Sequence, residues 1–173
     1  MDLKDFKIPP FMIKKIFPPK KCLFTVDSNG DGKVDSVQIK VLNVIQPITV
    51  PEKIELGDID IEDVDPSEYG KILLNNESID ISKGSHNIDL LKESLRVYLK
   101  GESYSFKDIF GEKLGGKTIA MGDTIDVVFK LDDAFLSKLT EGKHTLTLDS
   151  EKIPTLEINF ELTKNNMNQE LKI

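Results

Sequence analysis

Several residue types are scarce in this chain of 173 residues, and each scarcity excludes a class of structure or site. The chain has no Trp, one Cys (Cys22), two His and one Arg (Arg96). A single cysteine cannot form an intrachain disulfide, so the chain is not a disulfide-stabilised small domain. A single arginine leaves almost no bidentate clamp for phosphate or carboxylate groups. No apolar run approaches the roughly 20 residues of a membrane-spanning helix, so no membrane span is expected.

Negative charge is in excess, with 30 acidic against 23 basic residues and a net charge of −7. Nucleic acids require a basic face, so we expect no nucleic-acid partner. The acidic excess suits a soluble protein in a medium that contains Ca²⁺. The length fits one large domain that can bury a core without disulfides or structural metals.

Proline placement divides the chain into three parts. Residues 1–21 contain Pro9-Pro10 and Pro18-Pro19, which predict an extended arm or linker. Its apolar segment from Phe11 to Phe17 is too short and too basic for a signal peptide. We expect this segment to pack, extended, on a sheet edge of its own domain or of a neighbouring subunit. Residues 22–163 form the predicted domain, and the polar residues 164–173 are expected to be a frayed tail.

Seven to nine short segments alternate between apolar and polar residues, as β-strands do. The clearest is 124–131, where Ile125, Val127 and Phe129 share one face. Asn75-Asn76 predicts a tight hairpin turn, because Asn tolerates a positive φ. One short helix is expected near 133–140. The sequence therefore predicts an all-β fold, an antiparallel β-sandwich with one short helix.

The most informative motif is the loop Asp27-Ser28-Asn29-Gly30-Asp31-Gly32-Lys33-Val34-Asp35, which lies between two strand-like segments. Ca²⁺ takes six to eight oxygen ligands, and this loop offers oxygens at alternate positions. The glycines allow the sharp turn that such a loop needs. Without a cation, its crowded carboxylates would repel one another, so we expect a Ca²⁺-binding hairpin loop. The candidate ligands are the side chains of Asp27, Asn29, Asp31 and Asp35 and the backbone carbonyl of Lys33.

Weaker patterns carry alternative interpretations. Asp58, Asp60 and Glu62 share one face of a predicted strand, which indicates either a solvated face or a second Ca²⁺ site. The segment 111–118 matches the sequence pattern of a phosphate loop, but the sequence predicts neither a buried strand before it nor a long helix after it. His86 and His144 have no neighbouring Cys for a zinc site, and no motif supports either of them as a base for Cys22.

The calcium loop resembles those of EF-hands, dockerin repeats and the hairpin loops of integrin-type propellers. It departs from the EF-hand in having Gln38, not Glu, at the twelfth position and strands on both sides. Two longer stretches resemble prokaryotic Ig-like surface domains: Ile61-Glu62-Asp63-Val64-Asp65-Pro66-Ser67 before Ile72-Leu73-Leu74-Asn75, and Asp126-Val127-Val128-Phe129-Lys130 before 136–148. The resemblance implies an Ig-like sandwich with an extracellular structural or adhesive role. The early position of the loop leaves the strand order open.

These observations predict a non-enzymatic, calcium-stabilised structural or adhesive module of a cell-surface or extracellular assembly. Its partner would be a protein or a neighbouring subunit. The alternative is an accessory module of an exported enzyme that binds carbohydrate, although no aromatic platform is visible. An enzyme ranks last, because no acid–base pair or nucleophile stands out. Exposed aromatics on one sheet face would favour carbohydrate binding, and a deep pocket lined by perturbed carboxylates would favour an enzyme.

Overall fold

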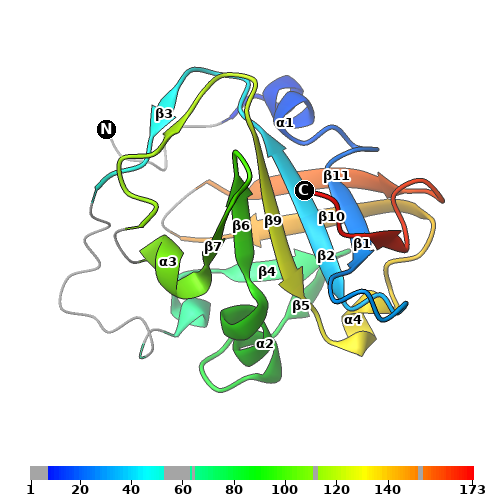
Figure 1. Ribbon diagram of the computed structural model, residues 1–173. Helices are drawn as coiled ribbons and strands as arrows, with labels where there is room; N and C mark the ends of the chain where they lie inside the picture. Colours follow the sequence, from blue (N-terminus) through cyan, green and yellow to red (C-terminus); the bar gives the residue numbers. More distant parts are fainter. Residues whose placement is uncertain (1–7, 53–62, 64, 111–112, 152–153) are drawn as a thin grey trace.

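The computed structural model describes residues 8–52, 63, 65–110, 113–151 and 154–173 (Figure 1). The strands in this part are β1 (Leu23–Asp27), β2 (Ser36–Leu42), β3 (Ile48–Thr49), β4 (Lys71–Leu74), β5 (Glu77–Ile79), β6 (Arg96–Leu99), β7 (Glu102–Ser105), β8 (Thr118–Ile119), β9 (Thr124–Lys130), β10 (Gly142–Asp149), β11 (Leu156–Leu162) and β12 (Gln169–Glu170). The helices are α1 (Pro10–Ile16), α2 (His86–Ser94), α3 (Phe106–Phe110) and α4 (Asp133–Leu136), with a 3₁₀ turn η3 (Pro66–Glu68). The prediction of a mostly β fold is confirmed.

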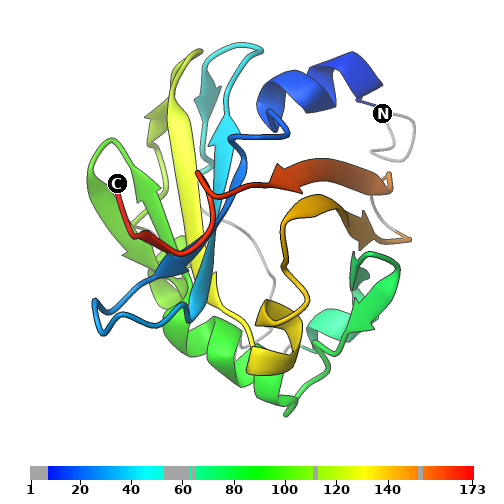
Figure 2. The ribbon, with the colours of Figure 1, turned by 90° about the vertical axis from the view of Figure 1, so that its right-hand side faces the viewer.

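Two large sheets face each other across the core. One has the strand order β12-β1-β2-β9-β6-β7 and the other β11-β10-β4-β5, while β3 and β8 form a small separate pair. Figure 1 shows β2 and β9 crossing steeply in front of β10 and β11, and Figure 2 shows the two layers from the side, with α2 and α4 across one end. Ig sandwiches pack their sheets in a more aligned way, so the Ig-like assignment stays a prediction.

The apolar alternation of the sequence places the core residues correctly. In the ladder between β2 and β9, Val37 pairs with Phe129 and Ile39 with Val127, so these side chains share the inner face. The core cluster draws on both sheets, and Phe160 of β11 is one of its most buried members. The outer residues of β11, such as Glu157 and Asn159, are exposed. One face of the smaller sheet is therefore exposed to solvent, as expected for an antiparallel sheet in a two-layer fold.

The hairpin predicted at Asn75-Asn76 is confirmed. β4 and β5 pair antiparallel across these two residues, whose φ angles are 50° and 69°. Two successive positive φ values give a turn whose twist matches the right-handed twist of the strands. The side chain of Asn75 also accepts a hydrogen bond from the Thr145 N–H at 3.0 Å, which joins the turn to β10.

The N-terminal arm is not extended between residues 10 and 16, and that prediction is wrong. These residues form α1, with Pro10 at the first helical position. Proline favours this position because its fixed φ suits a helix and its missing N–H would be unpaired there anyway. The expectation that the arm packs is met by Phe17, which contacts the core cluster, whereas Phe11 is 62% exposed.

The C-terminal residues, expected to fray, are packed. β12 pairs in parallel with β1, and the Leu171 N–H donates to the Asp27 carbonyl at 3.3 Å. Asn166 is only 1% exposed, and its amide donates to the Glu161 carbonyl at 2.9 Å. Such long-range polar contacts leave no periodic signal in the sequence.

More helix is present than the single short helix predicted. The expected helix exists as α4, where the Asp132 side chain accepts the Phe135 N–H at 2.9 Å as an N-cap. The sequence analysis missed α2, which has nine residues, begins at the N-cap Ser85 and contacts β9. Among the helices of the described residues, none combines the length and the apolar character needed to cross a bilayer.

Candidate calcium site

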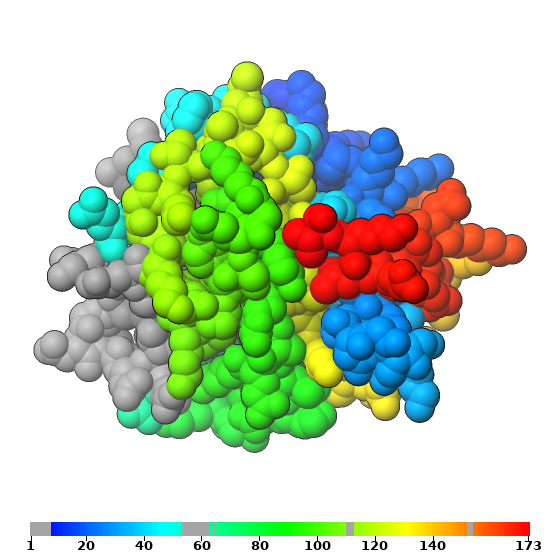
Figure 3. Space-filling view, viewed as in Figure 1, coloured from blue at the N-terminus to red at the C-terminus, as the bar shows by residue number. Residues whose placement is uncertain are grey.

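The candidate calcium loop joins β1 to β2 at one end of the larger sheet. The antiparallel ladder runs from Leu23 opposite Ile39 to Val26 opposite Ser36, which confirms the predicted hairpin. The Asp35 N–H donates to the Val26 carbonyl at 3.1 Å and closes the base of the loop. In the space-filling view of Figure 3 the loop lies on the surface beside the C-terminal segment.

Asp27 organises the first half of the loop. One of its carboxylate oxygens accepts the Gly30 N–H at 2.7 Å, and the other accepts the Gly32 N–H at 2.7 Å. Both glycines have positive φ angles, 77° and 86°, which a side chain would strain. The turn therefore requires glycine at these two positions, as the sequence indicated.

Asn29 and Asp31 continue the same pattern. Asn29 Oδ1 accepts the Asp31 N–H at 3.0 Å, and Asp31 Oδ1 accepts the Lys33 N–H at 2.8 Å. Asn29 Nδ2 also donates to Asp31 Oδ2 at 3.2 Å. These Asx turns fix the directions of three successive oxygen-bearing side chains on one short, exposed segment. The structure thus brings Asp27, Asn29 and Asp31 together.

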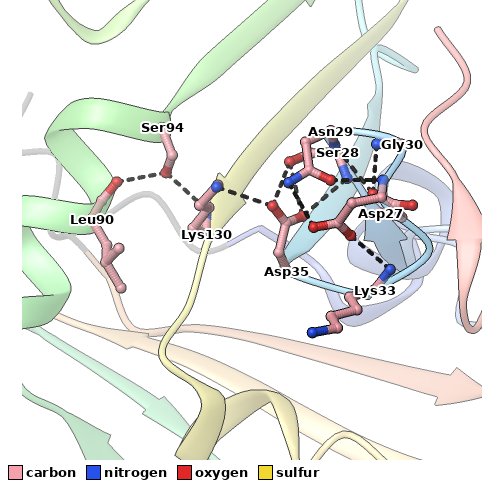
Figure 4. A network of polar contacts seen from close by, with 10 residues as sticks. Asp27, Ser28, Asn29, Gly30, Lys33, Asp35, Leu90, Ser94 and Lys130 are labelled. Atoms are coloured by element: carbon pink, nitrogen blue, oxygen red, sulfur yellow. Dashed lines mark hydrogen bonds and ion pairs between the residues drawn. The ribbon is translucent and has the colours of Figure 1, made fainter.

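Asp35 is placed differently from the other predicted ligands. Its carboxylate accepts the Ser28 N–H at 3.0 Å and the Ser28 hydroxyl at 2.8 Å, and it lies 3.0 Å from Lys130 Nζ (Figure 4). The Lys130 N–H in turn donates to Ser94 Oγ at 2.8 Å, and this hydroxyl donates to the Leu90 carbonyl. Asp35 therefore anchors the loop to β9 and, through Lys130, to α2.

Hydrogen bonds lower the pKa of both end carboxylates of the loop. Loss of water contact alone raises the pKa of Asp27, but the N–H groups of Gly32 and Gly30 hold it below its ordinary value of 3.8. Partial burial likewise raises the pKa of Asp35, but the Ser28 donors and Lys130 outweigh it and lower the pKa. Both groups are thus held in the charged form that a cation would require.

A titration of stability against pH tests the anchoring role of Asp35. Because its pKa is lowered by folding, the charged form stabilises the protein above the ordinary pKa of 3.8, and this contribution is lost as the pH falls below it. The melting temperature of Asp35→Asn should lie below that of the wild type at pH 7, and the gap should close below about pH 4. A gap that stays constant from pH 7 to pH 2 would contradict this role.

The first half of the loop brings oxygen-bearing side chains together, whereas the Asp35 carboxylate in the second half is held by Ser28 and Lys130. Within the described ranges, no group of three or more His, Cys, Asp or Glu side chains is placed to hold a metal ion. A calcium site here must therefore use the Asn29 amide oxygen and the Lys33 carbonyl as well as carboxylates. Such mixed oxygen sets suit a hard cation. A carboxylate oxygen that accepts one N–H keeps a second lone pair for an ion.

Gln38, which stands where an EF-hand has its last ligand, is occupied elsewhere. Its side chain is buried on the outer face of the larger sheet. Its Nε2 donates to Asp126 Oδ1 at 2.7 Å and to the Lys172 carbonyl at 3.0 Å. Two acceptor partners fix the amide orientation, so this residue joins the sheet to the C-terminal tail.

Glu170 is a carboxylate near the loop that sequence reasoning missed. It is the ladder partner of Asp27 in the parallel pairing of β12 with β1. Both residues line a surface hollow together with Gly30, Gly32 and Val34. Glu170 is distant from the loop in the sequence, and nothing in the pattern of residues 164–173 predicted that they would pair with β1.

Of the other candidate reactive groups, His144 and Cys22 serve packing, whereas His86 is exposed at the start of α2. His144 is buried, stacks on Phe160, and has ring-nitrogen contacts to the Asn75 side chain at 2.9 Å and the Thr140 carbonyl at 2.7 Å. Cys22 is fully buried, which raises the pKa of its thiol to about 11. A thiol with so high a pKa is a poor nucleophile at neutral pH.

The structure adds no support to the predicted second calcium site or to the phosphate-loop match. Asp58, Asp60 and Glu62 lie outside the described residues, so the second calcium site stays a prediction. The phosphate-loop match is followed by strand β8 and not by the helix that such a loop needs. Its Lys117 lies 2.8 Å from the Glu102 carboxylate, an ordinary surface ion pair.

Comparisons with protein-family models and with curated protein sequences give no match to the chain. The local resemblance of the loop to known calcium hairpins, and of the two longer stretches to Ig-like surface domains, stays a prediction. Function is therefore inferred from the contacts of this chain alone.

Proposed function

We propose that the chain is a non-enzymatic, calcium-stabilised structural or adhesive module of a cell-surface or extracellular assembly, in the manner of Ig-like surface domains. The chain of Asx turns from Asp27 to Lys33 carries this proposal, because it presents three oxygen-bearing side chains on one exposed turn. The proposed ligands are the side chains of Asp27, Asn29 and Asp31 and the carbonyl of Lys33. Asp35 completes the set.

The position of Asp35 supports a site of low affinity. To reach Ca²⁺, its carboxylate must exchange the ion pair with Lys130 for the metal, and this exchange reduces the net gain. Gln38 also supplies no bidentate ligand, because it is buried against Asp126. Calcium sites of extracellular modules typically have dissociation constants of about 10⁻⁴–10⁻³ M. Such a site fills in a calcium-rich medium outside the cell, which supports the proposed localisation.

A protein or a neighbouring subunit is the partner that such a module would bind. Three large aliphatic side chains, Ile45, Ile48 and Met121, are 45%, 48% and 64% exposed. They belong to two segments that pair through β3 and β8, at one end of the molecule. The exposed aromatic residues of the described chain are Phe11 on α1 and Tyr69 after η3, neither of them on a sheet face. This arrangement favours a protein partner over carbohydrate.

A calcium titration followed by ¹H–¹⁵N NMR tests the site directly. The amide signals of Gly30 and Gly32 should shift on Ca²⁺ addition, because both N–H groups donate to the Asp27 carboxylate. We expect a dissociation constant between about 10⁻⁴ and 10⁻³ M and a weakening of at least about tenfold in Asp31→Ala.

The matched control is Glu141→Ala, which removes one exposed carboxylate that is not part of the loop sequence. Its titration should coincide with that of the wild type. Unchanged Gly30 and Gly32 signals up to about 10 mM Ca²⁺, ten times the weakest constant expected, would exclude the site.

A further inference from the structure

The described residues leave a cavity of about 330 Å³ between the two large sheets. Protein cores are normally packed as densely as organic crystals, with few voids larger than a water molecule. Several inward-facing residues that line the cavity, including Ile72, Val127 and Leu146, are only half-buried. The volume falls at the lower end of the range of small-molecule sites, about 300–1,000 Å³.

The lining of the cavity is almost wholly apolar. Val41 and Val127 line it from the larger sheet, and Ile72 and Leu146 line it from the smaller one. Leu91 contributes from α2. This lining repels water and ions and selects aliphatic or aromatic molecules.

One polar side chain, Asn87, also lines the cavity. It lies in the first turn of α2, whose N-cap is Ser85, and it is 9% exposed. In the described part of the chain, Asn87 Oδ1 is the one buried side-chain oxygen or nitrogen atom without a hydrogen-bond partner. Buried acceptors are rarely left unpaired, because the loss of water is then uncompensated. A ligand that carries a donor would supply the missing partner once the side chain turns this covered oxygen toward the cavity.

The charged group of the one lysine that lines the cavity, Lys130, is held by an ion pair with the calcium loop. Lys130 lines the cavity, but its ammonium group lies 3.0 Å from the Asp35 carboxylate of the calcium loop. Its aliphatic stem can cover apolar surface while its charged end stays outside. No other charged side chain contributes to the described lining. An anionic ligand would therefore meet an unpaired acceptor without a compensating cation.

We propose that this cavity binds a neutral, mostly aliphatic molecule whose single hydroxyl group donates to Asn87 Oδ1. An engineered apolar cavity of about 150 Å³ holds one benzene molecule, with six carbon atoms. A cavity of about 330 Å³ scales to roughly 10–14 non-hydrogen atoms. The ligand class is thus a medium-chain alcohol or a molecule of similar size and polarity. Among the described residues that line this cavity, none belongs to the calcium loop.

The test compares three ligands of equal chain length: decan-1-ol, decanoate and decane. Binding is read from displacement of the uncharged fluorophore 1-aminoanthracene from the intact chain. We expect decan-1-ol to displace the fluorophore at concentrations at least about tenfold lower than decanoate, since only the alcohol offers a neutral donor. Equal potency of the alcohol and the acid, or no displacement by decan-1-ol, would overturn the proposal.

A matched pair of variants on β4 locates the binding. Ile72→Phe adds volume to the lining, whereas Leu73→Phe makes a similar change at the neighbouring residue, which does not line the cavity. The first variant should weaken decan-1-ol binding at least about tenfold, and the second should leave it unchanged. Equal effects of the two folded variants would place the binding elsewhere.

A third variant tests the polar contact. Asn87→Leu should weaken decan-1-ol binding about tenfold, as expected for loss of one buried hydrogen bond, and should leave decane binding unchanged or stronger. The same loss for decane and decan-1-ol would show that Asn87 is structural and would overturn its assigned role. Circular dichroism of each variant confirms that it is folded before the ligands are compared.

Discussion

Ca²⁺ at about 10 mM is expected to raise the melting temperature of the protein by roughly 3–10 °C over its value in excess EDTA. An ion that binds only the folded state adds about 1.4 kcal/mol of stability at a tenfold excess over its dissociation constant and about 2.7 kcal/mol at a hundredfold excess, which correspond to dissociation constants of about 10⁻³ and 10⁻⁴ M. In a domain of this size each kcal/mol shifts the melting temperature by about 2–4 °C.

Substitutions separate this effect from general salt stabilisation. Asp31→Ala should lose most of the Ca²⁺-dependent shift, because it removes a charged ligand from the middle of the loop. Glu141→Ala, with the same change in net charge, should keep the full shift. Mg²⁺ at equal ionic strength should have a smaller effect, because it demands a stricter octahedral geometry. Identical melting curves in EDTA and in millimolar Ca²⁺ would refute a stabilising role for the ion.

Gln38→Glu should destabilise the protein by roughly 3 kcal/mol at pH 7, despite restoring the residue that an EF-hand has at this position. The amide nitrogen of Gln38 donates to Asp126 Oδ1 at 2.7 Å and to the Lys172 carbonyl at 3.0 Å. A carboxylate in its place would face two acceptors, one of them charged. Lys40, which lies 2.7 Å from Asp126 Oδ1, neutralises only one of the two carboxylates.

Comparison with the EF-hand motif would predict tighter Ca²⁺ binding in Gln38→Glu, and the structure predicts the opposite. Because this position is buried in the sheet, the substitution should give no gain in Ca²⁺ affinity. The introduced carboxyl should also have a raised pKa, so the loss of stability should shrink as the pH falls toward 5. Gln38→Met, which loses the hydrogen bonds without adding charge, should cost less stability at pH 7 and show no such pH dependence. A tighter calcium site in Gln38→Glu would mean that this side chain faces the loop.

Local patterns predicted the parts of the fold that depend on neighbours in the sequence. The β1–β2 hairpin, the Asn75-Asn76 turn and the inward face of β9 follow from alternation and turn chemistry, which act over a few residues. The helix at Pro10 does not follow from the paired prolines, because proline favours extended chain and also the first position of a helix.

The remaining features depend on contacts between distant residues. The residue type and spacing of Asp35 are those of a calcium ligand. Only the folded structure shows that its carboxylate forms an ion pair with Lys130 of β9. The pairing of Glu170 with Asp27 joins opposite ends of the chain. The cavity is likewise a property of how two sheets face each other, since each lining residue has an ordinary core pattern in the sequence. Pattern analysis finds which residues are apolar but not whether they fill the space between the sheets.

If both proposals hold, Lys130 belongs to both sites, and this shared residue would link calcium binding to ligand binding thermodynamically. Its ammonium group holds Asp35 of the loop, and its stem lines the space between the sheets. If Ca²⁺ draws Asp35 away, the freed lysine alters the wall of the cavity. Reciprocity then requires that whatever factor Ca²⁺ applies to the affinity for the alcohol, the alcohol applies to the affinity for Ca²⁺. One side chain would thus let the calcium concentration set the affinity of the cavity for the alcohol.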